Sequence, residues 1–233
     1  PHLASLDDFH SRWNVMLMAS KGYVVAQPNF HGSTGYGQAW AESILGDHAS
    51  KPFEDVEKTV DHLVALGTAD PERLFAAGGS YGGYLVNWIL GHTDRYRALV
   101  SHAGVYDTLA QFASDSTWGR ARNYGAAPWE DPARAAQASP AMAAANFRTP
   151  TLVLHGEKDY RVPYTQGLNL YGVLNCVKAT IDGMTARGWG RIITISSEAW
   201  RMGTTIGISM YAAGKAGAIG FTLPGLRVGL YSP

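Results

Sequence analysis

The sequence predicts an α/β protein, a three-layer sandwich in which helices cover both faces of a mostly parallel sheet. Two observations predict this class. Short apolar runs rich in β-branched residues alternate along the chain with segments whose apolar residues recur at helical spacing. Neither a repeat of fixed period nor a separating linker divides the 233 residues, so we expect one domain over residues 1–233.

Each element is predicted from the spacing of its apolar residues and from the residues that end it. Gly22 and Gly67 end the first two helical patterns, and the β-branched run Tyr23–Asn29 is typical of a buried parallel strand. In order, we expect a helix over residues 6–21, a strand over 23–29, a helix over 53–64, a strand over 73–80, a helix over 84–91, strands over 98–104 and 151–157 with helices and loops between them, a helix over 165–187, a strand over 190–197, a helix over 209–222 and a last strand over 225–233.

Composition and charge limit the kinds of binding partner and the cellular compartment that we expect. Lys+Arg and Asp+Glu both number 19, so no basic excess favours nucleic acid or an anionic membrane, and we expect neither as a partner. No apolar run approaches the roughly 20 residues that span a bilayer, and no signal peptide is visible. The single cysteine, Cys176, excludes an intrachain disulfide and favours a reducing compartment, so we expect a cytoplasmic protein.

The segment GGSYGGY, residues 78–84, contains the pattern Gly-x-Ser-x-Gly. This spacing places a serine on a sharp strand-to-helix turn, where small residues let the backbone segments approach each other and leave the hydroxyl exposed. A predicted strand precedes the motif and a predicted helix comes after it. We therefore expect Ser80 to be a nucleophile, with the backbone N–H of Tyr81 facing a developing oxyanion.

Three segments, GYVVAQPNFHGSTGYGQAW, DPERLFAAGGSYGGYLVNWIL and TPTLVLHGEKDYRVPYTQGL, resemble successive signatures of the prolyl oligopeptidase family, in its acylaminoacyl-peptidase and dipeptidyl-peptidase branch. The resemblance covers about residues 1–170. It implies an α/β-hydrolase fold and a serine hydrolase that cleaves ester or peptide bonds through an acyl-enzyme on Ser80. It also implies that Asp159 is the acid of the catalytic triad, and it requires neither a metal nor a cofactor.

The general base of such a triad is missing from its usual place. The triad of this fold runs Ser, Asp, His along the chain, yet all eight histidines precede Asp159. His31, on a glycine-rich loop, and His102, at the end of a predicted strand, are the candidate substitutes, while His155 is expected to fix a loop. Without a base the serine is a poor nucleophile, so activity is expected to be impaired.

The front of the domain also departs from the family. The opening PHLAS resembles the residues just after the family's HGG turn, so we expect the strand carrying that turn to be missing and the fold to be incomplete at the N-terminus. We also expect the β-propeller that filters substrates in the family to be missing. Small esters or short peptides are therefore the expected substrates, and a homo-oligomer stays open.

From about residue 168 to 233 the sequence resembles a short-chain dehydrogenase/reductase instead. Tyr211 and Lys215 form Tyr-x-x-x-Lys, and the resemblance adds Ser197 and Asn169 as the rest of a reductase set that would use NAD or NADP. The glycine-rich turn that holds the pyrophosphate in that family is nowhere in the chain. The favoured interpretation is structural material replacing the last βα unit; a carbonyl reductase and a catalytically inactive hybrid stay open.

Overall fold

The computed structural model describes residues 13–115, 118–168, 193–195 and 229–231. The chain divides into two compact units, each of which is described by itself. The first unit draws on Pro1–Phe75, Arg95–Arg97 and Trp118–Ala138, and the second on Ala76–Asp94, Ala98–Thr117 and Ser139–Pro233.

The first unit is built around one long helix. Its elements are α1 (Val15–Ala19), α2 (Gln38–Glu42), α3 (Ser50–Ala65), the 3-10 turn η1 (Pro71–Arg73), α5 (Arg120–Tyr124) and α6 (Pro132–Gln137). The spacing of apolar residues correctly predicts α3, which ends just before Gly67. Gly67 has a φ of +70°, a left-handed conformation that glycine adopts without steric cost and that commonly stops a helix.

A partly buried network of ionic and hydrogen bonds ties Arg95 and Tyr96 to α3. The hydroxyl of buried Tyr96 donates to Glu57 Oε1 at 2.6 Å. Arg95 donates to Glu57 Oε2 and to Asp61 Oδ1, each at 2.8 Å. Burial, followed by the hydrogen bond to Glu57, raises the pKa of Tyr96, so its hydroxyl remains a donor at neutral pH.

Two expectations for the front of the chain are wrong. The helix expected over residues 6–21 begins only at Val15, because the Asn14 side chain caps it by accepting from the N–H groups of Met16 and Leu17; residues 1–12 lie outside the described part. The expected strand Tyr23–Asn29 does not form either.

The missing strand has a physical explanation. Tyr23 and Val24 are each 56% exposed, so the segment is not the buried strand that its β-branched residues favour. Strand preference produces a strand only where a neighbouring strand pairs with it. Within the described residues, β1 (Phe75–Gly79) stands at the edge of its sheet and pairs with β2 (Ala98–His102) alone.

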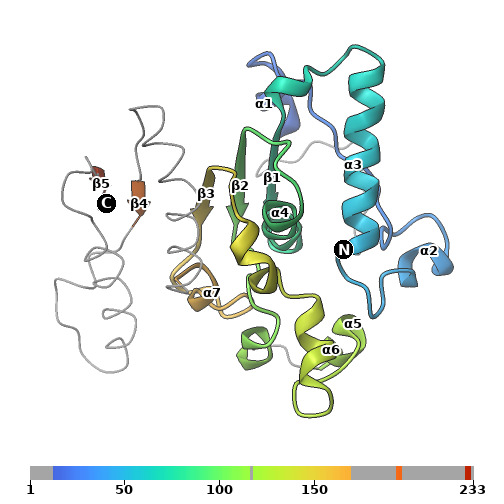
Figure 1. The fold of residues 1–233 in the computed structure, drawn as a ribbon, viewed down its shortest axis with the longest axis vertical. Coiled ribbons are helices and arrows are strands. Elements are labelled where there is room, and N and C mark those ends of the chain that lie inside the picture. Colours follow the sequence, from blue (N-terminus) through green and yellow to red (C-terminus); the bar gives the residue numbers. More distant parts are fainter. Residues whose placement is uncertain (1–12, 116–117, 169–192, 196–228, 232–233) are drawn as a thin grey trace. The chain divides into compact units, whose positions relative to one another are not determined.

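The second unit contains the three-stranded sheet, in the order β1-β2-β3, where β3 is Thr151–Leu154 (Figure 1). Strands β2 and β3 are parallel, with Leu99 opposite Thr151 and His102 opposite Leu154. The other elements are α4 (Tyr81–His92), the 3-10 turns η2 (Ala110–Ala113) and η3 (Pro140–Asn146), α7 (Thr165–Leu168), and β4 (Ile193–Ile195) and β5 (Gly229–Tyr231), which form a separate parallel pair. The expected α/β class with a parallel sheet is confirmed.

Helix α4 covers one face of this sheet and forms its core. Most of its residues are buried and apolar, and it packs on β2 and on η3. Along β2, Leu99 and Ser101 are buried, and the Ser101 hydroxyl donates to the Gly83 carbonyl of α4 at 3.3 Å. The alternation of side chains along a strand therefore directs these two residues toward α4.

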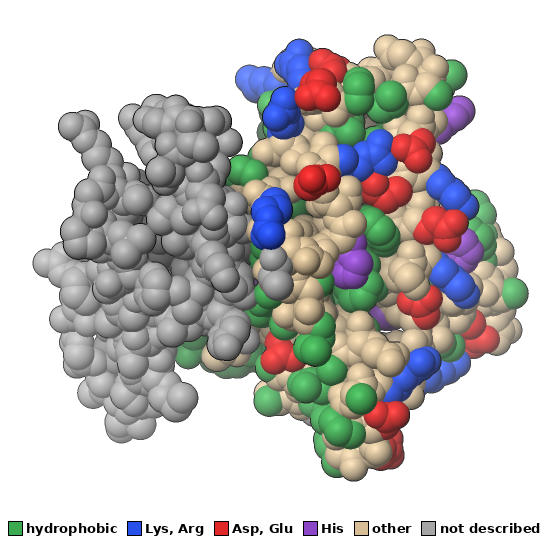
Figure 2. Space-filling model, viewed as in Figure 1, with side chains coloured by type: hydrophobic (Ala, Val, Ile, Leu, Met, Phe, Trp, Pro, Cys, Tyr) green, Lys and Arg blue, Asp and Glu red, His purple; other side chains and the backbone are tan. Residues whose placement is uncertain are grey.

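Charged side chains of both signs are interspersed on the face of the described residues drawn in Figure 2, in keeping with the net charge of zero. None of the described helices is both long and apolar enough to cross a bilayer.

We predict that His48 makes the first unit sensitive to acid. Burial lowers the pKa of His48 from 6.5 to about 3, and its ring meets Tyr124 edge-on at 5.7 Å. Since the unfolded chain takes up this proton near pH 6.5 and the folded chain does not, the contribution is complete above pH 6.5 and is lost as pH falls toward 3. The loss is at most about 1.4 kcal/mol per pH unit.

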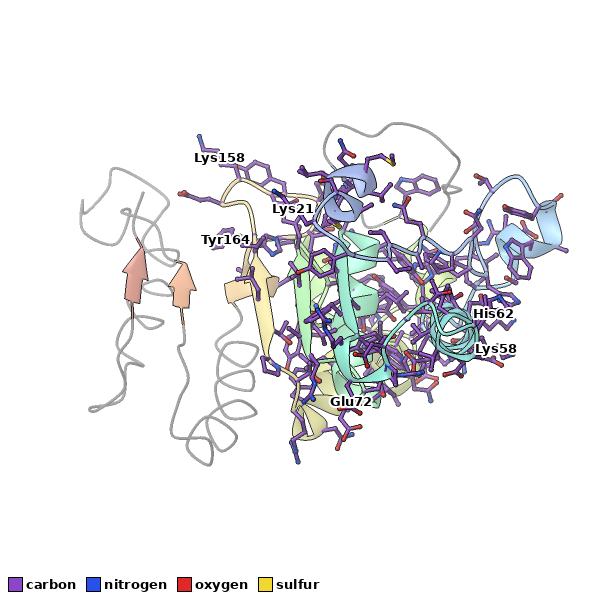
Figure 3. All side chains as sticks on the ribbon, turned by 90° about the horizontal axis from the view of Figure 1, so that it is seen from above. Lys21, Lys58, His62, Glu72, Lys158 and Tyr164 are labelled. Carbon is purple, nitrogen blue, oxygen red and sulfur yellow. The ribbon has the colours of Figure 1, made fainter. Side chains whose placement is uncertain are left out.

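Urea unfolding at pH 7 and pH 5 measures this effect. The parent chain should lose more free energy of unfolding between the two pH values than His48→Gln does. His62→Gln, which changes an exposed histidine on α3 (Figure 3), should behave like the parent. An equal loss in the parent and His48→Gln would contradict the prediction.

Candidate active site

Ser80 lies between the end of β1 and the start of α4. Its φ of 56° is unusual for a residue other than glycine and costs on the order of 1–3 kcal/mol. Two backbone hydrogen bonds hold this conformation: the Ser80 N–H donates to the His102 carbonyl at 2.9 Å, and the Tyr84 N–H donates to the Ser80 carbonyl at 3.0 Å. Ser80 is exposed, as a nucleophile requires.

The glycines around Ser80 make this turn possible, although not all for the reason the motif suggests. A Cβ on Gly78 would overlap the carbonyl carbon and oxygen of Gly82, whereas a Cβ on Gly82 would meet nothing within 4 Å. A second contact of this kind joins Gly83 to Gly104, where an added Cβ on Gly83 would come within 2.7 Å of the Gly104 Cα. The motif therefore predicted Gly78 correctly but missed the Gly83–Gly104 contact, which only the fold brings together.

The backbone at Tyr81 meets one requirement of an oxyanion site. Tyr81 is the first residue of the twelve-residue helix α4. The first N–H groups of a helix have no carbonyl within the helix to bond, and they lie at the positive end of the helix dipole. Negative charge developing beside Ser80 would be stabilised there.

Asp159 lies in a tightly closed loop after β3, which we call the acid loop (residues 155–162). Its Oδ1 accepts from the N–H groups of Arg161 and Val162 at 3.0 and 2.9 Å. The His155 Nε2 donates to the Val162 carbonyl at 2.8 Å and lies 3.8 Å from Asp159 Oδ2. His155 thus fixes the loop, as predicted. Figure 3 shows Lys158 projecting from the acid loop. Tyr164 comes two residues after this loop, and burial raises the pKa of its hydroxyl.

The two candidate bases belong to different units. His102 ends β2 in the same unit as Ser80, and it is half-buried. Since Leu99 and Ser101 face α4, the alternation along β2 places His102 on the opposite face of the strand. Its carbonyl, which bonds the Ser80 N–H, lies at the turn itself.

His31 belongs to the first unit and already has a carboxylate partner. Its Nδ1 lies 2.6 Å from Asp55 Oδ2, which also accepts from the His31 backbone N–H at 2.7 Å. The ring stacks on Trp40 with the centroids 3.9 Å apart. This arrangement fixes the imidazole in one orientation, and the role of His31 as a base stays a prediction.

The residues of the alternative reductase set fall outside the described part of the chain: Asn169, Ser197, Tyr211 and Lys215. Cys176 lies outside it as well. Among the residues that are described, no cluster of three or more His, Cys, Asp or Glu side chains could hold a metal ion.

Comparison with known proteins identifies the family. The prolyl oligopeptidase family model matches residues 9–187, more than half of the chain. The chain belongs to the prolyl oligopeptidase family. Dipeptidyl-peptidase 5 of Schizosaccharomyces pombe is 38% identical over 172 residues, which are 72% of this chain and 25% of that protein. The chain thus spans about a quarter of this relative's length.

Solved structures of similar proteins agree with the fold described above. The acylaminoacyl peptidase of Pyrococcus horikoshii superposes with a TM-score of 0.66 at 34% identity, over 70% of this chain and 27% of that one. A puromycin-hydrolyzing peptidase of Mycobacterium tuberculosis gives a TM-score of 0.59 at 30% identity, over 65% of this chain and 23% of that one. The α/β-hydrolase-like fold and the expected resemblance are confirmed.

A second family model, that of the short chain dehydrogenases, matches residues 156–225. It overlaps the prolyl oligopeptidase match over residues 156–187, a stretch that includes the expected join near residue 168. This match covers less than a third of the 233 residues and agrees with the expected resemblance of residues 168–233 to a short-chain dehydrogenase/reductase.

We predict opposite outcomes for alanine at the two glycines of the serine motif. Gly78→Ala should lower the free energy of unfolding by about 2–3 kcal/mol, because its Cβ would overlap the Gly82 backbone. Gly82→Ala should leave stability unchanged or raise it by up to about 1 kcal/mol, since alanine favours helix and nothing lies in the way. Thermal and urea unfolding compare the two variants; equal losses in both would contradict the prediction.

Proposed function

We propose that this chain is a serine hydrolase of the peptidase type, which forms an acyl-enzyme on Ser80. One observation supports the proposal above the others: Ser80 is held exposed at a φ of 56° between a strand and a helix, in a chain of the prolyl oligopeptidase family. Strained backbone of this kind persists where the surrounding structure fixes it, and it gathers at catalytic sites.

In the proposed reaction the Ser80 hydroxyl attacks a carbonyl carbon while a base takes its proton. The carbonyl oxygen becomes an oxyanion, which the Tyr81 N–H stabilises. When the intermediate collapses, the leaving amine or alcohol takes the proton from the base and departs, and the acyl group stays on Ser80. The base then takes a proton from water, whose oxygen attacks the acyl carbonyl. The second intermediate collapses, the Ser80 oxygen recovers the proton from the base, and the carboxylic acid is released. Asp159 would hold the base in one tautomer and orientation.

For the base we propose His102. It shares a compact unit with Ser80, and its own carbonyl accepts the Ser80 N–H at 2.9 Å, so the two residues are neighbours at the end of the sheet. His155 is less suitable, because its side chain is only 8% exposed and is bonded within the acid loop. His31 remains the alternative that the test below must exclude.

The proposed substrates are short peptides with a modified or free amino end, or small esters. The names of the relatives, dipeptidyl-peptidase 5 and acylaminoacyl peptidase, support the first class. Activated small esters are the more permissive test, because their leaving groups depend less on protonation by the base than a peptide amine does.

We predict that a fluorophosphonate labels Ser80 covalently. The reagent needs an accessible and activated serine, so intact mass should rise by one adduct in the parent chain and stay unchanged in Ser80→Ala. An exposed serine outside the turn provides the control: Ser50→Ala, at the start of α3, should be labelled like the parent. A parent chain that folds but takes no adduct would refute the hydrolase proposal and favour an inactive domain.

The labelling rate also distinguishes the bases. His102→Gln should slow labelling by at least about tenfold, in line with the usual contribution of general-base catalysis. His31→Gln should leave the rate unchanged if His102 is the base. The reverse pattern would assign the base to His31 instead.

For residues 168–233 we propose a structural role rather than hydride transfer. A reductase must hold the pyrophosphate of its cofactor on a glycine-rich strand-to-helix turn of its own pattern, which the sequence lacks. Within the described residues, the glycine-rich passage from β1 to α4 carries the pattern Gly-x-Ser-x-Gly at residues 78–82, which differs from the reductase pattern. This glycine-rich segment of the described chain therefore does not fit the pyrophosphate of a nicotinamide cofactor.

We accordingly predict that neither NADH nor NADPH binds at millimolar concentration. Titration of either cofactor into the folded chain should leave its nicotinamide fluorescence equal to that of free cofactor. A saturable change that Tyr211→Phe or Lys215→Met abolishes would instead restore the short-chain reductase alternative.

A further inference from the structure

Two glutamine side chains are almost completely buried in the second unit. Gln111, in η2, is 1% exposed, and Gln166, in α7, is 2% exposed. A buried amide that lacks hydrogen bonds costs about 1–3 kcal/mol, so a fold keeps such residues where their bonds are satisfied. Their partners therefore reveal which segments this pair of side chains connects.

Gln166 bonds the backbone of the segment after β2. Its Oε1 accepts from the N–H groups of Tyr106 and Asp107 at 3.0 and 2.8 Å, and its Nε2 donates to the Asp107 carbonyl at 2.8 Å. The side chain thus pairs with that backbone from 59 or 60 positions further along the chain. The same Nε2 lies 3.4 Å from Gln111 Oε1, which links the two glutamines.

Gln111 continues the connection into the acid loop. Its Nε2 donates to the Arg161 carbonyl at 2.7 Å. Arg161 is also the residue whose backbone N–H binds Asp159 Oδ1. Two further bonds fasten the same loop next to η2: the Asp115 N–H donates to the Tyr160 carbonyl at 3.1 Å, and Arg161 Nε lies 2.8 Å from Asp115 Oδ1.

We propose that Gln166 and Gln111 are positioning residues, which hold the Asp159 carboxylate in place for the reaction through the connection Asp107–Gln166–Gln111–Arg161. The segment at its other end comes directly after β2, which ends at His102. This inference rests on the proposed function. A carboxylate that orients an imidazole must be held to within about 0.5 Å, and a satisfied buried polar network supplies that rigidity.

Glutamate at either position tests the proposal without changing the shape of the side chain. In Gln166→Glu the ionised carboxylate can still accept from Tyr106 and Asp107, but it can no longer donate. We expect the fluorophosphonate labelling rate of Ser80 at pH 8 to fall at least about tenfold. Burial raises the pKa of such a carboxyl group, so acidification restores a donor, and the ratio of variant to parent rate should rise as pH falls.

Gln111→Glu should show the same recovery, because it loses and regains the donor to Arg161. Gln137→Glu is the matched control: Gln137 is exposed, lies in the first unit, and should keep a ratio near one at every pH. Circular dichroism melting at each pH confirms that the variants are folded.

Hydrogen exchange of the Arg161 and Val162 amides supplies a readout that does not need activity. Both amides bond Asp159, so their exchange should accelerate at least about tenfold in Gln166→Glu and Gln111→Glu but not in Gln137→Glu. Unchanged exchange, or slower labelling with no recovery at low pH, would overturn the positioning role. A parent chain that takes no label would refute the hydrolase proposal, while the exchange result would still decide whether the glutamines hold the acid loop.

Discussion

The close approach of backbone to backbone at the turn from β1 to α4 is the constraint on which the rest of the second unit depends. Gly78 must lack a Cβ because the Gly82 backbone occupies that space, and Gly83 must lack one because Gly104 does. These contacts bring the start of α4 against the loop after β2. They also force Ser80 into a φ of 56°, which the end of β2 stabilises through the hydrogen bond from the Ser80 N–H to the His102 carbonyl. The same close contacts therefore cause both the strained backbone at Ser80 and the packing of α4 on the sheet.

Much of this site could be predicted from the sequence because its signals are local. The serine motif lies within seven residues, and the acid loop comes directly after its strand. The contacts between Gly83 and Gly104, and between Gln166 and Asp107, join segments that are far apart in the chain. Nothing local distinguishes such a glycine or glutamine from one on the surface, so only the fold identifies them.

The incorrect expectations also come from local sequence signals. The run Tyr23–Asn29 has the composition of a buried strand, but composition expresses a preference and pairing requires a neighbour. Within the described residues the edge strand β1 has β2 as its partner. The helix expected over residues 6–21 is interrupted before Val15, because the Asn14 side chain accepts the hydrogen bonds that begin a helix at Val15. At Val15 a specific side-chain cap therefore outweighed the helical spacing of the apolar residues.

The distribution of histidines shows why the proposed acid and the proposed nucleophile do not by themselves define an active hydrolase. Ser80 and Asp159 each sit in a rigid, hydrogen-bonded turn of the same unit. Backbone hydrogen bonds fix the conformation of both turns, so this conformation does not depend on which residue is the base. A base, by contrast, acts only through a side chain at the correct distance. His102 has its backbone bound to the nucleophile turn, whereas His31 has its own carboxylate in the other unit. On the proposed function, the fold holds strained Ser80 and hydrogen-bonded Asp159 in place, and the position of the base side chain decides whether they react.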